Sequence, residues 1–110
     1  MTDGLGENRI ALTGRVSARI QLRRSPAGIP IARFTLEHSS MQPEAGVARR
    51  QTFLIGVRAV GDELCRQLGD LQPGAAVRVF GFLARSEQAA EDYRLLICAR
   101  TVAILSDREQ

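Results

Sequence analysis

The chain has 110 residues, of which 45% are hydrophobic and 25% charged, with a formal net charge of +3 at pH 7. This size and composition predict one globular domain, over 8–105 with short tails at 1–7 and 106–110, that folds without metal or disulfide staples. No apolar run approaches the roughly 18 residues of a membrane span, and segment 1–7 is acidic, unlike a targeting peptide. We therefore expect a cytoplasmic protein.

The first predicted strand is long and basic. From Asn8 to Arg24, apolar or small residues recur at the even positions between Ile10 and Leu22, and four odd positions carry arginine. A period of two predicts a strand with one buried face and one charged face. The run exceeds the usual strand length of about 5 to 6 residues, and Gly14 predicts a bend at a barrel corner. A long, bent, basic strand suggests a small barrel that binds a polyanion.

The next two strands alternate in the same way. A proline- and glycine-containing turn at 25–30 precedes a second strand at 31–38. Segment 39–48 also contains proline and glycine and is predicted to be a long loop. A third strand at 49–60 places on one face Phe53, Ile55, Val57 and Ala59, and on the other Arg50, Thr52, Leu54 and Arg58.

The remaining elements complete a recognisable order. Leucines spaced by four and three residues predict a short helix within 61–71, with Asp62 as a candidate cap. Two further strands are expected on either side of a polar loop at 86–92, and the last strand switches its apolar parity near Arg100, which predicts a β-bulge. Three strands, a helix and two strands is the order of an all-β, five-stranded OB barrel with its helix between strands three and four. An SH3-like barrel or an open α+β sheet fits less well.

Charge is distributed unevenly along the chain. All fifteen cationic residues are arginine, and segment 8–58 has nine of them beside two glutamates, a net charge of +7, whereas segment 59–110 has a net charge of −2. Arginine binds phosphate through two hydrogen bonds and stacks on bases, so the basic half suits a nucleic acid. A solvated basic face remains the alternative.

Few residues are suited to catalysis or metal binding. Cys65 and Cys98 lie far apart and the chain has one histidine, so neither a zinc site nor a C-x-x-C motif is possible, and both thiols are expected to be free and buried. The carboxylates of the 86–92 loop raise the alternative of a metal-dependent nuclease, but His38 sits within a predicted strand and general bases are scarce. We expect no enzyme activity, no cofactor and no metal.

Several stretches together resemble one known family. They are Asn8-Arg9 with Leu12-Thr13-Gly14, Ser25-Pro26-Ala27-Gly28-Ile29-Pro30, Phe34-Thr35-Leu36-Glu37-His38, Glu44-Ala45-Gly46 and Val79-Phe80-Gly81-Phe82. Over residues 8–105 the chain is similar to the primosomal replication protein N (PriB) family, and S-P-x-G-I-P followed by F-x-L-E-H is the most specific part of the resemblance. The resemblance implies a dimeric OB-fold accessory protein of bacterial replication restart that lacks catalytic activity. It further implies binding to single-stranded DNA, to the helicase PriA and to DnaT.

The chain departs from the family pattern where bases would stack. The best-known members have a tryptophan in the third strand and a phenylalanine before it, at the places of Thr52 and Val47 here. Their lysine-rich loop between the last two strands is acidic here, with Arg85 and Arg94 at its ends. Stacking contributes about 1 to 3 kcal/mol per base, so DNA binding is expected to be weak. The alternative is a primosome adaptor that contacts proteins and has little DNA affinity.

Nine residues form the predicted DNA site. They are Arg23, Arg24, Arg33, Arg49, Arg50, Thr52, Phe82, Arg85 and Arg94. Arg23 aligns with a basic position of the family. Arg33 and Arg50 are expected to point outward, or to pair with a carboxylate such as Glu37 in a surface contact of about 0 to 1 kcal/mol. Phe82 is expected either to stack on a base or to fill a dimer contact, and Tyr93 is a second candidate for stacking if it is exposed.

Overall fold

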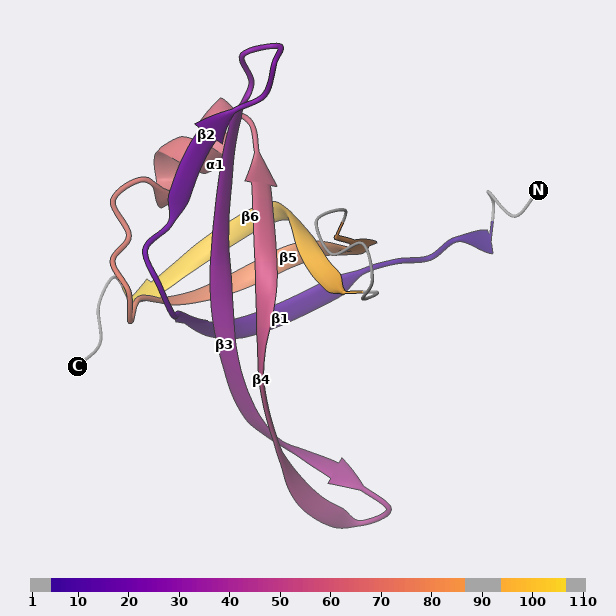
Figure 1. Cartoon of the computed structure of the whole chain (residues 1–110). Helices are drawn as coiled ribbons and strands as arrows, with labels where there is room; N and C mark the ends of the chain where they lie inside the picture. The colour runs from indigo at the N-terminus through magenta and orange to yellow at the C-terminus, as the bar shows by residue number, and fades with distance from the viewer. Residues whose placement is uncertain (1–4, 87–93, 107–110) are drawn as a thin grey trace.

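The computed structural model describes residues 5–86 and 94–106 and consists of six strands and one helix (Figure 1). The elements are β1 (Ile10–Val16), β2 (Gln21–Arg24), β3 (Pro30–Glu44), β4 (Val47–Val60), α1 (Asp62–Leu68), β5 (Ala76–Arg85) and β6 (Leu95–Ser106). Within the described residues, no helix is long and apolar enough to cross a membrane.

Five of the strands close into a ring. The order is β1-β5-β6-β4-β3, with β2 added at the far side of β3, and β4 and β6 run parallel while the other pairs are antiparallel. Two residue pairs between β1 and β3, Arg15 with Glu37 and Val16 with Leu36, complete the ring. The helix lies between β4 and β5 in the chain, so the predicted OB fold is confirmed.

The first predicted strand is two strands rather than one. β1 pairs with β5 and β2 pairs with β3, so residues 17–20 leave strand geometry where the chain turns from one neighbour to the other. The expected bend is present, but a continuous strand from Asn8 to Arg24 is wrong. Gly14 permits the close approach that joins β1 to β3, because a Cβ atom there would lie 2.5 Å from the Glu37 carbonyl oxygen.

Segment 39–48, predicted to be a loop, instead continues a hairpin. β3 and β4 pair without interruption from Ile31–Val60 to Glu44–Val47. Ala45 and Gly46, with φ of 52° and 80°, form the two-residue turn, and positive φ at both positions matches the twist of a hairpin. The predicted loop is wrong because Pro43 lies within the ladder opposite Ala48 and Gly46 lies in the turn, so neither residue ends the strand pairing. Residues 39–52, called the arm below, extend away from the ring (Figure 1).

The core fills the ring and is closed at one end by α1. Its fully buried side chains include Val16, Ala32, Leu36, Ala59, Leu68, Val77, Val79 and Ile97. Gly61, rather than the predicted Asp62, is the residue that caps α1, and no side chain caps it. Cys65 and Cys98 are buried free thiols, as expected.

The predicted bulge in the last strand is confirmed. Phe80 pairs with Thr101 and Gly81 pairs with Ala99, so Arg100 is the extra residue. An extra residue re-aims the side chains around it. Here the Arg100 guanidinium carbon lies 5.0 Å from the centre of the Phe82 ring.

Candidate nucleic-acid interface

One face of the β3–β4 pair carries three of the nine predicted site residues, Arg33, Arg50 and Thr52. Alternate residues point outward there, on β3 Arg33, Thr35, Glu37 and Ser39, and on β4 Arg58, Gly56, Leu54, Thr52 and Arg50. We call this set the outer β3–β4 face. It contains three arginines and one carboxylate, and it runs from the ring out along the arm, so it is a positively charged strip.

Arg50 and Thr52 are held together on the arm. The Arg50 Nη1 donates a hydrogen bond to Ser39 Oγ at 3.0 Å, and the Thr52 hydroxyl donates to the same oxygen at 3.4 Å. Both residues are exposed, as predicted. Arg49, one residue earlier, lies on the opposite face of the arm and forms an exposed ion pair of 3.4 Å with Glu44. The structure therefore separates Arg49 from the outer β3–β4 face.

Arg33 and Arg94 meet in a groove of about 340 Å³ on the ring. Its lining also includes Arg58, Gly56 and Leu96. Arg33 is half-buried rather than freely exposed, and Arg58 lies directly opposite it on β4. Arg58 was not among the predicted site residues, although the strand alternation already placed it on the same face as Arg50.

A row of register partners continues across the ring from this groove, on the same side of the sheet as Arg58. Arg58 aligns with Cys98 on β6, and Cys98 aligns with Phe82 on β5, so Phe82 lies two strand spacings, about 10 Å, from Arg58. Phe82 is half-buried, with Arg100 over its ring. Sequence reasoning found Arg100 only as a bulge, because its contact with Phe82 depends on the pairing of β5 with β6.

The remaining predicted residues lie at the ends of this surface. Arg85 ends β5 and Arg94 precedes β6, and the Ser86 amide donates to the Arg94 carbonyl oxygen at 2.8 Å. Both arginines are exposed at the base of the connection between the strands. The acidic residues predicted for that connection, and the candidate stacking residue that follows them, lie outside the described residues; they are Glu87, Glu91, Asp92 and Tyr93.

The two arginines of β2 differ in direction. Arg23 pairs with Ile31, two residues from Arg33, so strand alternation puts Arg23 on the same side as Arg33. Arg24 has the opposite parity, and its Nη1 donates to the Gly28 carbonyl oxygen at 2.7 Å. Arg24 therefore braces the turn between β2 and β3.

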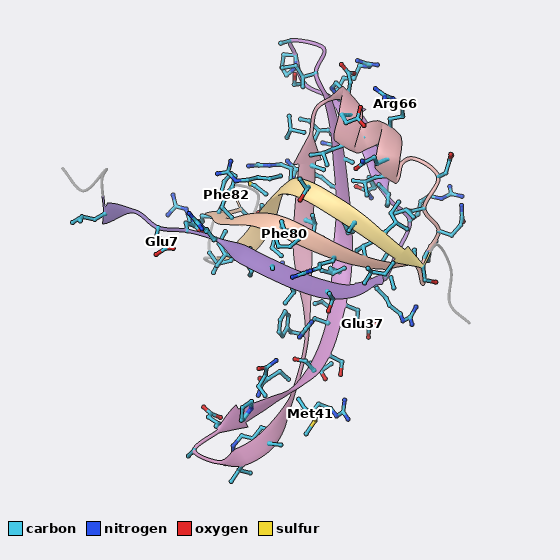
Figure 2. All side chains as sticks on the ribbon, turned by 180° about the vertical axis from the view of Figure 1, so that it is seen from behind. Glu7, Glu37, Met41, Arg66, Phe80 and Phe82 are labelled. Carbon is cyan, nitrogen blue, oxygen red and sulfur yellow. The ribbon has the colours of Figure 1, made fainter. Side chains whose placement is uncertain are left out.

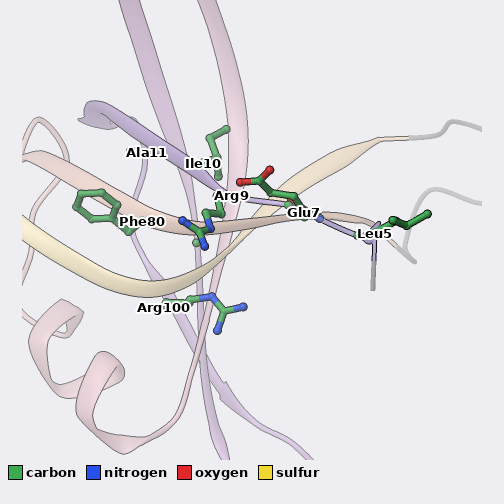
Figure 3. A pocket seen from close by; sticks show the side chains of 10 residues that line it. Leu5, Glu7, Arg9, Ile10, Ala11, Phe80 and Arg100 are labelled. Atoms are coloured by element: carbon green, nitrogen blue, oxygen red, sulfur yellow. The ribbon is translucent and has the colours of Figure 1, made fainter. Parts of the chain in front are cut away.

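A second hollow of about 1060 Å³ lies beside β1, away from the outer β3–β4 face (Figure 3). Arg9, Phe80 and Arg100 line it together with Glu7. Figure 2 shows Phe80 and Phe82 on the ring, distant from Met41 on the arm. The Arg78 guanidinium carbon lies 4.5 Å from the centre of the Phe80 ring, a cation–π contact.

Metal-binding clusters are absent from residues 5–86 and 94–106, since no three His, Cys, Asp or Glu side chains gather there. His38 is buried between Thr13 and Ser40, so it does not reach solvent as a general base would.

Comparisons with known proteins agree with this geometry. Residues 8–99 match the family described as "Another single-strand binding protein family". The chain is 32% identical over 98 residues to replication restart protein PriB of Proteus mirabilis, covering 89% of this chain and 93% of that one. It is 29% identical over 101 residues to PriB of Nitrosomonas europaea, covering 92% and 91% of the two chains.

Solved structures give the same result. PriB from Ralstonia solanacearum superposes with a TM-score of 0.78 at 28% identity, covering 91% of this chain and 99% of that chain. A Plasmodium falciparum single-stranded DNA-binding protein in complex with single-stranded DNA has a TM-score of 0.77 at 17% identity, covering 92% and 96%, and shares the fold. The chain belongs to the PriB family of OB-fold single-strand binding proteins.

Proposed function

We propose that this chain binds single-stranded DNA in the cytoplasm as a non-enzymatic accessory protein of the replication restart primosome. The supporting observation is the outer β3–β4 face, on which Arg33, Arg58 and Arg50 outnumber the single carboxylate of Glu37. In OB folds the equivalent strands and adjoining loops bind oligonucleotides. The relatives named replication restart protein PriB support the assignment to replication restart.

The chemistry of this face favours phosphate over bases. Thr52 and Val47 supply no aromatic ring on the arm, and Phe82 is half-buried beneath Arg100. Arginine contacts to phosphate give affinity that depends on salt and carries little sequence preference. We therefore propose binding that is weak, sensitive to salt and tolerant of sequence.

We infer three partners besides DNA. The chain forms a homodimer and contacts PriA and DnaT, with which it helps to reload the replicative helicase at stalled forks. The PriB relatives support this assignment. Exposed apolar side chains on β4 and β5, Leu54 at 63% and Phe80 at 39%, supply area for a protein contact.

A fluorescence-anisotropy titration tests the DNA-binding role. A labelled single strand of about 30 nucleotides is titrated with the full chain at low and at high salt. Saturable binding at low salt that weakens as salt rises is expected. No binding at low salt would contradict the proposal and favour the adaptor role, in which protein contacts are the main function.

A further inference from the structure

Arg33 and Arg58 form a pair of like charges inside the sheet. They are register partners in the antiparallel β3–β4 ladder, and each lies between two buried core residues, so both side chains leave the same face. Like charges directly opposite each other destabilise a sheet. Among the described residues, ion pairs join Arg49 to Glu44 and Arg66 to Glu63, and none reaches Arg33 or Arg58.

Hydrogen bonding leaves this pair with unused donors. Arg33 Nε is buried and has no hydrogen-bond partner among the described residues. Arg58 Nη2 donates to Cys98 Sγ at 3.0 Å, and a thiol sulfur is a weak acceptor. A guanidinium has five N–H donors, so the two side chains together retain donors for an acceptor with several oxygens.

The groove beside the pair has room for such an acceptor. Gly56 and Thr35, the register pair two positions along the ladder from Arg33 and Arg58, line this groove together with Arg94, in a volume of about 340 Å³. Position 56 adds no side chain to the groove, and a Cβ atom there would lie 3.7 Å from the Leu96 Cβ, an ordinary contact.

We propose that Arg33 and Arg58 act as one clip that holds a single backbone phosphate of single-stranded DNA in this groove. This inference rests on the proposed DNA-binding function and adds Arg58, with its partner, as the anchoring point on the ring. Arginine suits the task because its planar fork binds phosphate oxygens bidentately. A phosphate between the two guanidinium groups converts their repulsion into two attractions and supplies acceptors for their free donors.

The slope of log K against log salt tests the clip. A labelled oligo(dT) of about 30 nucleotides is titrated with the wild-type chain and with Arg33→Gln, Arg58→Gln and the double variant. One phosphate contributes about 0.7 to the slope for a single strand. Since the clip holds one phosphate, each single variant and the double variant should lose the same amount, about 0.7. Arg66→Gln, which removes one charge from α1, should keep the wild-type slope.

Three outcomes would overturn the clip. A loss of about 1.4 in the double variant, twice that of each single variant, would mean two independent phosphate contacts. Wild-type slopes in all variants would mean that DNA does not cross this groove, and the proposed function would survive. Failure of the wild-type chain to bind any single strand would contradict the clip and the proposed function together.

One further variant, and a second measurement on Arg58→Gln, examine the groove without relying on charge loss in the complex. Gly56→Ala fits beside Leu96 but adds a methyl group to the groove, so it should weaken DNA binding while the melting temperature stays within about 4 °C of wild type. Arg58→Gln removes the repulsion in the free protein, so its melting temperature without DNA should rise by about 1 to 5 °C. Unchanged DNA affinity in Gly56→Ala, or a lower melting temperature in Arg58→Gln, would contradict the clip.

Discussion

The imidazole of His38 joins β3 to β1 through the carbonyl oxygen of Thr13, which lies 2.6 Å from Nδ1. A carbonyl oxygen only accepts, so Nδ1 is the donor. On its other side, Nε2 lies 2.7 Å from the Ser40 hydroxyl, and Gln42 Nε2 donates to that hydroxyl at 3.0 Å. The Phe53 side chain packs against the imidazole, with 5.0 Å between the two ring centroids. His38 therefore fastens the root of the arm to the ring.

Replacing His38 with leucine should cost stability because it removes this buried contact. We expect His38→Leu to lower the free energy of unfolding by about 1 to 3 kcal/mol, measured by urea denaturation. Ser40→Ala is the matched control: it removes the partner of Nε2, together with the acceptor of exposed Gln42, keeps the bond to Thr13, and should cost about 0.5 to 1.5 kcal/mol. A His38→Leu variant as stable as wild type would contradict the structural role assigned to the His38 imidazole.

Binding of single-stranded DNA should depend strongly on salt. With three to five phosphates contacted per site, the slope of log K against log salt should lie at about −2 to −3.5. Anisotropy titrations over a series of salt concentrations give this slope. A flat response would mean that no electrostatic DNA site exists on the chain.

The two neighbouring arginines of the arm should differ in their effect on binding. Arg50 lies on the outer β3–β4 face, whereas Arg49 lies on the opposite face and pairs with Glu44. Arg50→Ala should therefore weaken DNA binding and reduce the slope of log K against log salt by about 0.7. Arg49→Ala removes the same charge but should change the affinity and the slope less. Equal losses of DNA affinity in the two variants would show that Arg49 and Arg50 contribute equally, although they lie on opposite faces of the arm. No loss in either variant, or in both together, would favour the adaptor role.

The acidic connection between β5 and β6 should oppose DNA binding. Replacing its carboxylates by lysine, as Glu87→Lys, Glu91→Lys and Asp92→Lys, should strengthen binding without altering base preference, because the change acts on phosphate. A control with the same change in net charge replaces carboxylates around α1, as Asp62→Lys, Glu63→Lys and Asp70→Lys. Affinity gains of equal size in the two variants would mean that net charge alone is responsible. No gain in the first would place this connection away from the DNA.

The chain should be a homodimer in solution. Exposed apolar side chains such as Leu54 and Phe80 leave area that a second copy would cover. Light scattering at micromolar concentration should give twice the mass of one chain. A monomer mass under these conditions would contradict the prediction.

The local pattern of the sequence determined the strands, the helix and the last bulge. Alternation identified the inward face of β4, and the parity switch located the bulge near Arg100, because burial on one face leaves a period of two in the chain. The sequence-based prediction put both Arg49 and Arg50 in the DNA site, whereas the structure places them on opposite faces of the arm. The alternation did not predict the break at 17–20, because these residues continue the period of two. They leave strand geometry only because β1 and β2 pair with different strands.

Tertiary structure alone decided which charged side chains become neighbours. Arg33 and Arg58 are 25 positions apart in the chain and meet only because the turn at Ala45 and Gly46 fixes the hairpin register. A change of one residue in that register would turn one strand over and send its arginine to the other face. Likewise, Arg100 reaches Phe82 only through the pairing of β5 with β6. Such contacts depend on the register between strands that are distant in the chain, and this register cannot be predicted from the sequence of either strand by itself.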